Sequence, residues 1–216
     1  MAYSTYMEIV NSIMDEIDED PLSQSDFDDP PTAEGRRVKN YVNFAYNKVV
    51  QGKPDWSWLE FSQTFNTVAN QKAYTVGTEL DSTTDLSSLP TMNSADDPSM
   101  EILSYSEFKR KYAEYEGNTT GKPYIAYVHE GKLYLYPTPD QVYSIELFTQ
   151  KKHTALSAYN DTPLIPIESR DVLYYGALYR ATSKEFEQRR QEVLADFRQR
   201  LQDLRNNDDK NHKGHA

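Results

Sequence analysis

Four segments of the chain show the apolar spacing of amphipathic helices. They lie at about residues 5–18, 33–51, 167–183 and 184–206. In the first segment Ile9, Ile13 and Ile17 recur every four residues, which places them on one side of a helix. Thr32 stands just before the second segment and is a suitable N-cap, because its side-chain oxygen accepts a hydrogen bond from the first helical turn. The pattern therefore predicts four helices, two near each end of the chain.

The last two predicted helices differ in how their apolar residues are distributed. Segment 167–183 is apolar nearly all round, which is typical of a helix buried in a core or between subunits. Segment 184–206 carries a narrow apolar seam at spacings of three, four and three, formed by Leu194, Phe197, Leu201 and Leu204. A seam of this kind resembles the contact line of a coiled coil. Residues 206–216 contain no hydrophobic anchor, so we expect a flexible C-terminal tail.

Between the second and third helices the apolar period changes to two, the period of β-strands. Residues 54–76 predict a β-hairpin, and residues 121–148 predict an antiparallel meander. Its turns are expected at Glu130-Gly131 and from Pro137 to Asp140. Residues 77–99 are polar and predict a long loop, and a short helix is expected from Ser104 to about Tyr115.

The order of these elements predicts an α+β fold, a four-helix unit with an inserted antiparallel β-rich domain. The helical domain is expected to be discontinuous, with the insertion and a tail completing the chain. The helical domain is expected to contain residues 1–59 and 156–205. The inserted β-rich domain is expected over residues 60–155, and the flexible tail over residues 206–216. Trp56 and Trp58 stand at the first junction. We interpret them as a core plug rather than an interface anchor, because tryptophan is usually well buried.

Charge is distributed unevenly along the chain, whose net charge is −11. Residues 1–30 hold nine carboxylates and no Lys or Arg. One interpretation is a solvated helix followed by a linker. The other is a surface that repels DNA or docks on a basic partner. The general surface is too acidic to bind phosphate backbones.

The sequence offers little catalytic or metal chemistry. The absence of cysteine excludes disulfides, thiolate zinc sites and cysteine catalysis. No phosphate-binding loop, nucleophile elbow or zinc-protease motif is present. His212 and His215 lie three apart, but we interpret them as part of a polar tail. We therefore expect no catalytic residues, no metal and no cofactor. No apolar run is as long as a membrane span, and the N-terminus lacks a signal pattern, so no membrane contact is expected.

Several short stretches occur in an order found in one family. They are Trp56 with Trp58, Phe65 to Gln71 with Tyr74, Gly121 to Pro123, Leu133 to Pro139, and Asp161 to Pro166. This combination resembles the head-to-tail adaptor proteins of short-tailed bacteriophages, which are related in role to tail tubular protein A. The resemblance covers roughly residues 35–205, and the chain departs from the family's pattern at residues 77–99.

The resemblance implies a structural virion protein that is not an enzyme. Such a protein assembles in the host cytoplasm as a homo-oligomeric ring, a dodecamer, at the neck of the virion. The ring joins the portal protein to the tail nozzle protein and surrounds part of the DNA ejection channel without binding DNA specifically. Two alternatives stay open: another virion or scaffold protein that forms no ring, and a tail-associated glycan hydrolase.

We expect the two partners to bind at opposite parts of the chain. The charged last helix with its apolar seam is the expected portal interface, through Leu194, Phe197, Leu201, Leu204 and Arg205. The turns of the meander present backbone on a rigid sheet, as binding loops usually do. They are the expected tail interface, through Glu130, Gly131, Pro137 and Asp140.

Overall fold

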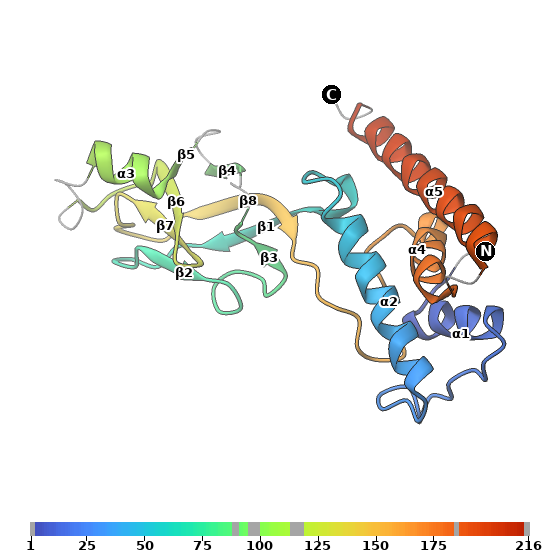
Figure 1. The fold of residues 1–216 in the computed structure, drawn as a ribbon. Coiled ribbons are helices and arrows are strands. Elements are labelled where there is room, and N and C mark those ends of the chain that lie inside the picture. The colour runs from blue at the N-terminus through green and yellow to red at the C-terminus, as the bar shows by residue number, and fades with distance from the viewer. Residues whose placement is uncertain (1–2, 88–90, 95–99, 113–118, 184–185, 214–216) are drawn as a thin grey trace. The chain divides into compact units, whose positions relative to one another are not determined.

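The computed structural model describes residues 3–87, 91–94, 100–112, 119–183 and 186–213 (Figure 1). The chain forms two compact units. The helical unit contains residues 1–58 and 153–216, and the β unit contains residues 59–152. The chain enters and leaves the β unit once, so this unit is an insertion in a helical framework. The predicted α+β fold with an inserted β-rich domain is confirmed.

The helices of the helical unit follow the predicted pattern. They are α1 (Tyr6–Glu16), α2 (Ala33–Val50), α4 (Asp171–Ala181) and α5 (Glu187–Lys213), and a short 3-10 turn, η3 (Ile167–Ser169), precedes α4. Thr5 caps α1 in a reciprocal capping box with Glu8. Thr32 caps α2 as predicted, since its side chain accepts a hydrogen bond of 3.0 Å from the Gly35 amide. These caps satisfy amides that a helix start leaves without partners.

Helix α4 is apolar on most sides because it packs against three other helices, α1, α2 and α5. Gly176 lies at the closest point: a Cβ atom there would stand 2.9 Å from Ala45 Cβ on α2 and 2.9 Å from Phe197 Cε2 on α5. Both distances are shorter than a carbon–carbon contact, so only glycine fits. The absence of a side chain at this position therefore lets three helices meet.

The chain returning from the β unit is held against α2 by polar contacts. The Asn43 side chain accepts a hydrogen bond of 2.8 Å from the Leu156 amide and donates one of 2.9 Å to the Leu156 carbonyl oxygen. Asn43 also donates to the Tyr6 hydroxyl oxygen at 2.9 Å, which links this segment to α1. A half-buried Asn that satisfies both ends of its amide fixes the path of the segment.

The β unit contains two four-stranded sheets. In the first, β8 (Ser144–Lys151) pairs antiparallel with β1 (Glu60–Asn66), β3 (Thr84–Asp85) and β4 (Thr91–Ser94). The second has the order β2 (Ala73–Thr75), β7 (Lys132–Tyr136), β6 (Ile125–His129), β5 (Glu101–Ser104). The β5–β6 pair is parallel and departs from the antiparallel pattern that the sequence predicts.

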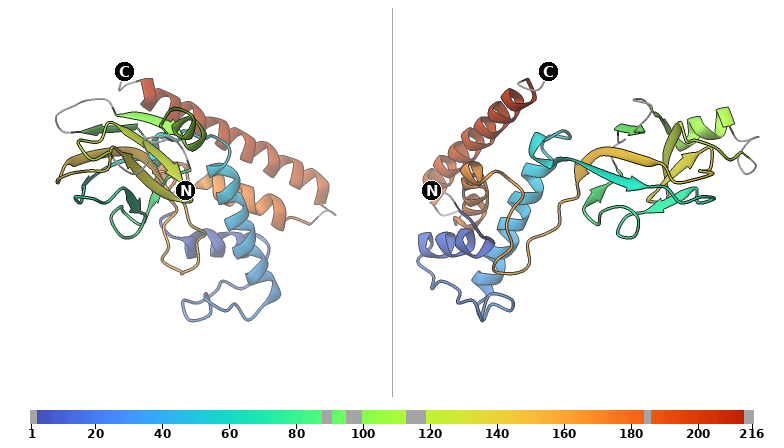
Figure 2. Two further views of the ribbon diagram at one scale, coloured as in Figure 1. Left: turned by 90° about the vertical axis from the view of Figure 1, so that its left-hand side faces the viewer. Right: turned by 180° about the vertical axis from the view of Figure 1, so that it is seen from behind.

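The two sheets enclose the main core of the β unit. Ile145 and Leu147 of β8 are buried with Leu133 and Leu135 of β7, as the alternation of these strands predicts. Helix α3 (Tyr105–Tyr112) lies on the other face of the second sheet (Figures 1 and 2). The ring of Phe108 in this helix stacks on the ring of Tyr127, with centroids 4.1 Å apart. The layers of this unit are therefore sheet, sheet and helix.

The predicted hairpin over residues 54–76 is wrong. Strand β1 pairs with β8 and β2 pairs with β7, so the two strands belong to different sheets. Phe65 of β1 and Tyr74 of β2 meet across the core instead, with ring centroids 5.2 Å apart. Strand β8 offers β1 seven residue pairs, whereas β2 is only three residues long. The longer, non-local pairing therefore replaces the local one.

The predicted loop over residues 77–99 is also wrong for the residues that the structure describes. Strands β3 and β4 lie in this range and pair with β8. Leu80, Leu86 and Met92 are buried in the core between the sheets. These residues stand six positions apart, too far apart to reveal a helical or a strand period, which explains why the pattern gave no signal. Residues 88–90 and 95–99 lie outside the described ranges.

The predicted tail requires a correction as well. Helix α5 continues to Lys213, and Asp208 is buried with 2% of its surface exposed. Residues 206–213 are therefore helical rather than flexible, and residues 214–216 lie outside the described ranges. The helix continues because Asp208 has polar partners elsewhere in the helical unit, which the local sequence does not reveal.

We expect substitution of Gly176 by valine to destabilise the helical unit. The added atoms would overlap Ala45 and Phe197, and overpacking of a close contact costs about 1–3 kcal/mol. The free energy of unfolding, measured by circular dichroism in urea, tests this. The control is Ala195→Val on the exposed face of α5, which introduces the same β-branched side chain into a helix without a clash. Equal stability of the two variants would contradict the role assigned to Gly176.

Candidate functional site

The long helix α5 presents two different faces. Its 27 residues include a buried side with Val193 and Leu204, whose exposed fractions are 6% and 2%. The opposite side is polar and exposed, and its side chains bond to one another along the helix, as in the pair Gln199–Asp203 at 2.9 Å. Such i, i+4 contacts support an exposed helix that has little apolar surface.

The apolar seam predicted from the sequence lies largely inside the helical unit. Leu204 is buried, while Leu194, Phe197 and Leu201 are half-buried. Phe197 packs where Gly176 leaves room. Arg205 donates a hydrogen bond of 3.2 Å to the Gly52 carbonyl oxygen. The seam therefore packs α5 against the rest of the helical unit. The part of α5 that a partner can reach is the exposed polar side next to the seam.

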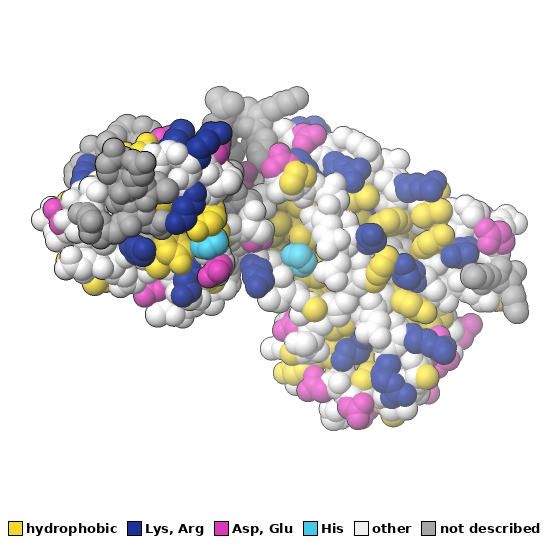
Figure 3. Space-filling view, turned by 60° about the vertical axis from the view of Figure 1, so that its left-hand side comes forward, with side chains coloured by type: hydrophobic (Ala, Val, Ile, Leu, Met, Phe, Trp, Pro, Cys, Tyr) yellow, Lys and Arg dark blue, Asp and Glu magenta, His cyan; other side chains and the backbone are white. Residues whose placement is uncertain are grey.

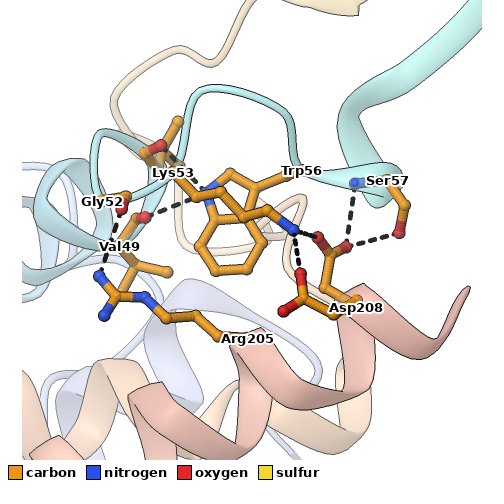
Figure 4. A network of polar contacts seen from close by, with 9 residues as sticks. Val49, Gly52, Lys53, Trp56, Ser57, Arg205 and Asp208 are labelled. Atoms are coloured by element: carbon orange, nitrogen blue, oxygen red, sulfur yellow. Dashed lines mark hydrogen bonds and ion pairs between the residues drawn. The ribbon is translucent and has the colours of Figure 1, made fainter. Parts of the chain in front are cut away.

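The C-terminal part of α5 is fastened by a carboxylate cluster (Figure 4). Asp208 accepts hydrogen bonds from the Ser57 amide at 2.9 Å and from the Ser57 hydroxyl at 2.5 Å. Its other oxygen lies 2.6 Å from Lys53 Nζ, which also contacts Asp209 at 2.7 Å. We call Lys53, Ser57, Asp208 and Asp209 the α5 clasp. It holds the helix to the segment that follows α2.

The electrostatics of the clasp favour a charged lysine. Burial by itself would lower the pKa of Lys53, but its hydrogen bonds to Asp208 and Asp209 outweigh burial and raise that pKa. A raised lysine pKa means that the ion pair contributes its full stability at neutral pH. On the alkaline side, this contribution is lost as the pH rises through the raised pKa of Lys53.

Trp56 also holds the segment that follows α2 in place. It is fully buried, and its Nε1 donates to the carbonyl oxygens of Val49 and Val50 at 3.2 and 3.1 Å (Figure 4). These carbonyls belong to the last turn of α2, where a helix leaves acceptors without partners. The Lys53 ammonium lies 5.6 Å from the Trp56 ring centroid. Trp56 is thus a core residue, as the sequence suggested.

Sequence reasoning missed the clasp, because Asp208 stands in the polar run of residues 206–216. Its burial depends on Lys53 and Ser57, which are about 150 positions away in the sequence. If the helix is continued beyond Leu204, Asp208 lies four residues, or about one turn, further along the same buried side. That spacing was the single local signal of its position.

The turn residues expected to contact the tail differ in exposure. Glu130 and Gly131 are exposed and adopt left-handed φ values of 48° and 72°, which fit a two-residue hairpin turn. Asp140 is exposed and accepts a hydrogen bond of 2.7 Å from the Tyr143 hydroxyl. Pro137, by contrast, is buried in the β unit and leaves little side-chain surface for a partner. Three of the four residues therefore remain available.

Catalytic and metal chemistry receives no support from the described residues. Within those ranges no three His, Asp or Glu side chains gather as a metal site. The side chain of His212 and all of His215 lie outside the described part. Among the described helices, none combines the length and the apolar character that crossing a bilayer requires.

The sequence profile of one family matches residues 4–215, nearly the whole chain. That family is described as SU10 adaptor protein. The chain belongs to this adaptor family. The resemblance to phage head-to-tail adaptors is thereby confirmed at the level of the family, which is one of structural proteins. No curated protein matches the chain closely enough to add a relative.

We expect loss of the buried carboxylate of the clasp to lower the free energy of unfolding of this protein. Asp208→Ala leaves the Ser57 donors without their acceptor and removes one partner of Lys53, at a cost of about 1–3 kcal/mol. The matched control is Asp209→Ala, which removes the same charge from a side chain that is 60% exposed. Such an exposed pair contributes about 1 kcal/mol or less. Urea denaturation compares the two, and a larger loss for Asp209→Ala would refute the clasp.

Proposed function

We propose that this chain is the head-to-tail adaptor of a short-tailed phage. Copies assemble into a homo-oligomeric ring, a dodecamer, between the portal protein and the tail nozzle protein. The ring surrounds part of the DNA ejection channel. The family match over residues 4–215 is the observation that carries this proposal. The net charge of −11 agrees with a channel wall that does not retain DNA.

We assign the two partners to the two parts of the chain. The helical residues 1–59 and 156–205, together with the last turns of α5, bind the portal. The inserted residues 60–155 bind the nozzle. The support is the exposed polar side of α5, which runs beside Leu194 and Leu201, and the exposed turns at Glu130-Gly131 and Asp140. A rigid helix held by a clasp loses little entropy when a partner binds it.

Two truncations separate portal binding from folding. A chain that ends after Lys210 keeps Leu204 and the whole α5 clasp. We expect its free energy of unfolding to stay unchanged while portal binding, measured by surface plasmon resonance, becomes weaker, because the last turn of α5 is removed. A chain that ends after Leu204 also loses the clasp and should be both unbound and less stable. Undiminished portal binding by the shorter chain would remove the part of α5 after Leu204 from the interface.

Single thiols can identify the partner of each unit, because the chain contains no cysteine. We expect Asp140→Cys in the β unit to crosslink to the nozzle protein in assembled particles. Gln202→Cys, on the exposed side of α5, should crosslink to the portal protein. Mass spectrometry of the adducts reads out both. The reverse pattern would overturn the orientation but not the adaptor role.

A further inference from the structure

The second sheet of the β unit carries an aromatic surface that α3 covers only in part. Phe108 and Tyr112 of α3 pack over Tyr136, with ring centroids 5.4 Å from it in each case. Beyond α3, side chains of β6, β7 and the start of α3 remain partly exposed. We call this surface the aromatic–lysine face; it consists of Tyr105, Lys109, His129, Lys132 and Tyr134. Figure 3 shows hydrophobic, basic and histidine side chains gathered on this unit.

The rings of the aromatic–lysine face are already fixed in position. His129 stacks on Tyr105 with centroids 3.7 Å apart and planes 12° apart. Tyr134 stacks on the buried ring of Tyr127 at 5.0 Å. Strand register places Lys132 opposite His129, and Lys109 Nζ lies 5.6 Å from the Tyr105 centroid. Stacked side chains have little rotamer freedom left to lose when a partner docks.

The polar groups of this face are chiefly donors. Lys132 is exposed, and within the described ranges no carboxylate lies at ion-pair distance from it. The hydroxyls of Tyr105 and Tyr134 have no hydrogen-bond partner in the part of the chain that the structure describes. Two acids are near, since Glu130 lies 3.7 Å from His129 and Glu79 interacts electrostatically with Lys132. A surface that carries two lysines and two tyrosine hydroxyls fits a partner that supplies carboxylate acceptors.

The same chain carries such an acceptor-rich surface in its helical unit. We call residues 18–29 the acidic loop. Asn11 holds it by accepting from the Leu22 amide and donating to the Leu22 carbonyl oxygen, both at 2.9 Å. Leu22 and Phe27 are buried, so the loop is ordered. Its six carboxylates are exposed and form no ion pair within the described residues: Asp18, Glu19, Asp20, Asp26, Asp28 and Asp29.

We propose that the acidic loop of one copy docks on the aromatic–lysine face of the next copy. The argument is charge complementarity between an ordered loop with six exposed carboxylates and a preformed donor surface. Because the two surfaces differ, the contact is heterologous and generates a ring when it closes. This inference rests on the proposed adaptor ring and names the contact that builds it. Nucleic acid is a poorer occupant, since the chain as a whole repels phosphate.

Complementary charge reversals test the contact. The face variant is Lys109→Glu/Lys132→Glu, and the loop variant is Asp20→Lys/Asp29→Lys. Each variant alone brings like charges together in every copy-to-copy contact. In an equal mixture, the acidic loop of the face variant meets the basic face of the loop variant, and the reversed pair also matches. The control is Arg110→Glu/Lys152→Glu, which changes the same unit by the same charge at exposed positions.

The measurement is the number of full-length copies bound per portal ring, followed by mass photometry as the protein concentration rises. Wild type and control should load steeply, because each bound copy helps the next. Each variant alone should load without cooperativity, with a half-saturating concentration higher by on the order of tenfold. The equal mixture should restore steep loading. Variants that load like wild type, or a mixture as defective as its components, would overturn the proposal.

The two proposals fail in different ways. If wild type does not bind the portal, the adaptor function is wrong. The proposed contact between copies can then still be tested by crosslinking the free protein in solution. A zero-length crosslinker that joins carboxylates to amines should link copies of wild type and of the mixture, but not of either variant alone. If the variants instead lose nozzle binding while copies still crosslink to each other, the aromatic–lysine face belongs to the nozzle and the inference is refuted.

Discussion

The close approach of three helices at Gly176 is the constraint on which the helical unit depends. A missing side chain brings α4 within van der Waals contact of Ala45 on α2 and Phe197 on α5. Packing at this density fixes the position of α5 relative to α2. The α5 clasp then adds a second attachment toward the C-terminal end of the same helix, through Asp208. Two attachments so far apart make α5 a rigid element rather than a free arm.

Rigidity of this kind suits an adaptor, whose work is geometric. Three exposed surfaces of this adaptor-family protein are ordered by buried anchors. The polar side of α5 is held by Leu204 and Asp208, the acidic loop by Leu22 and Phe27, and the aromatic–lysine face by stacking on Tyr127. Each surface is polar where it is exposed and apolar where it is fixed.

The exposed surfaces also divide the charge of the molecule. The acidic loop concentrates carboxylates in the helical unit, whereas the aromatic–lysine face offers ammonium and hydroxyl donors in the β unit. Net charge alone describes such a chain as acidic and therefore repulsive. The local distribution instead gives one copy two complementary faces, which is the requirement for heterologous assembly.

The sequence by itself determined the helices, the cap at Thr32, the inserted β domain and the hairpin of β6 and β7. These features follow from local periodicity and short-range hydrogen bonds. The expected third strand of the meander, β8, lies in the other sheet. Only the tertiary structure decided that β1 and β2 part into two sheets, that Leu80, Leu86 and Met92 enter the core, and that α5 extends through Asp208. Each of these depends on partners distant in sequence: β8, the facing sheet, and Lys53 with Ser57. The role of Gly176 is of the same kind, because a glycine within a helix signals its purpose only when the neighbouring helices are in place.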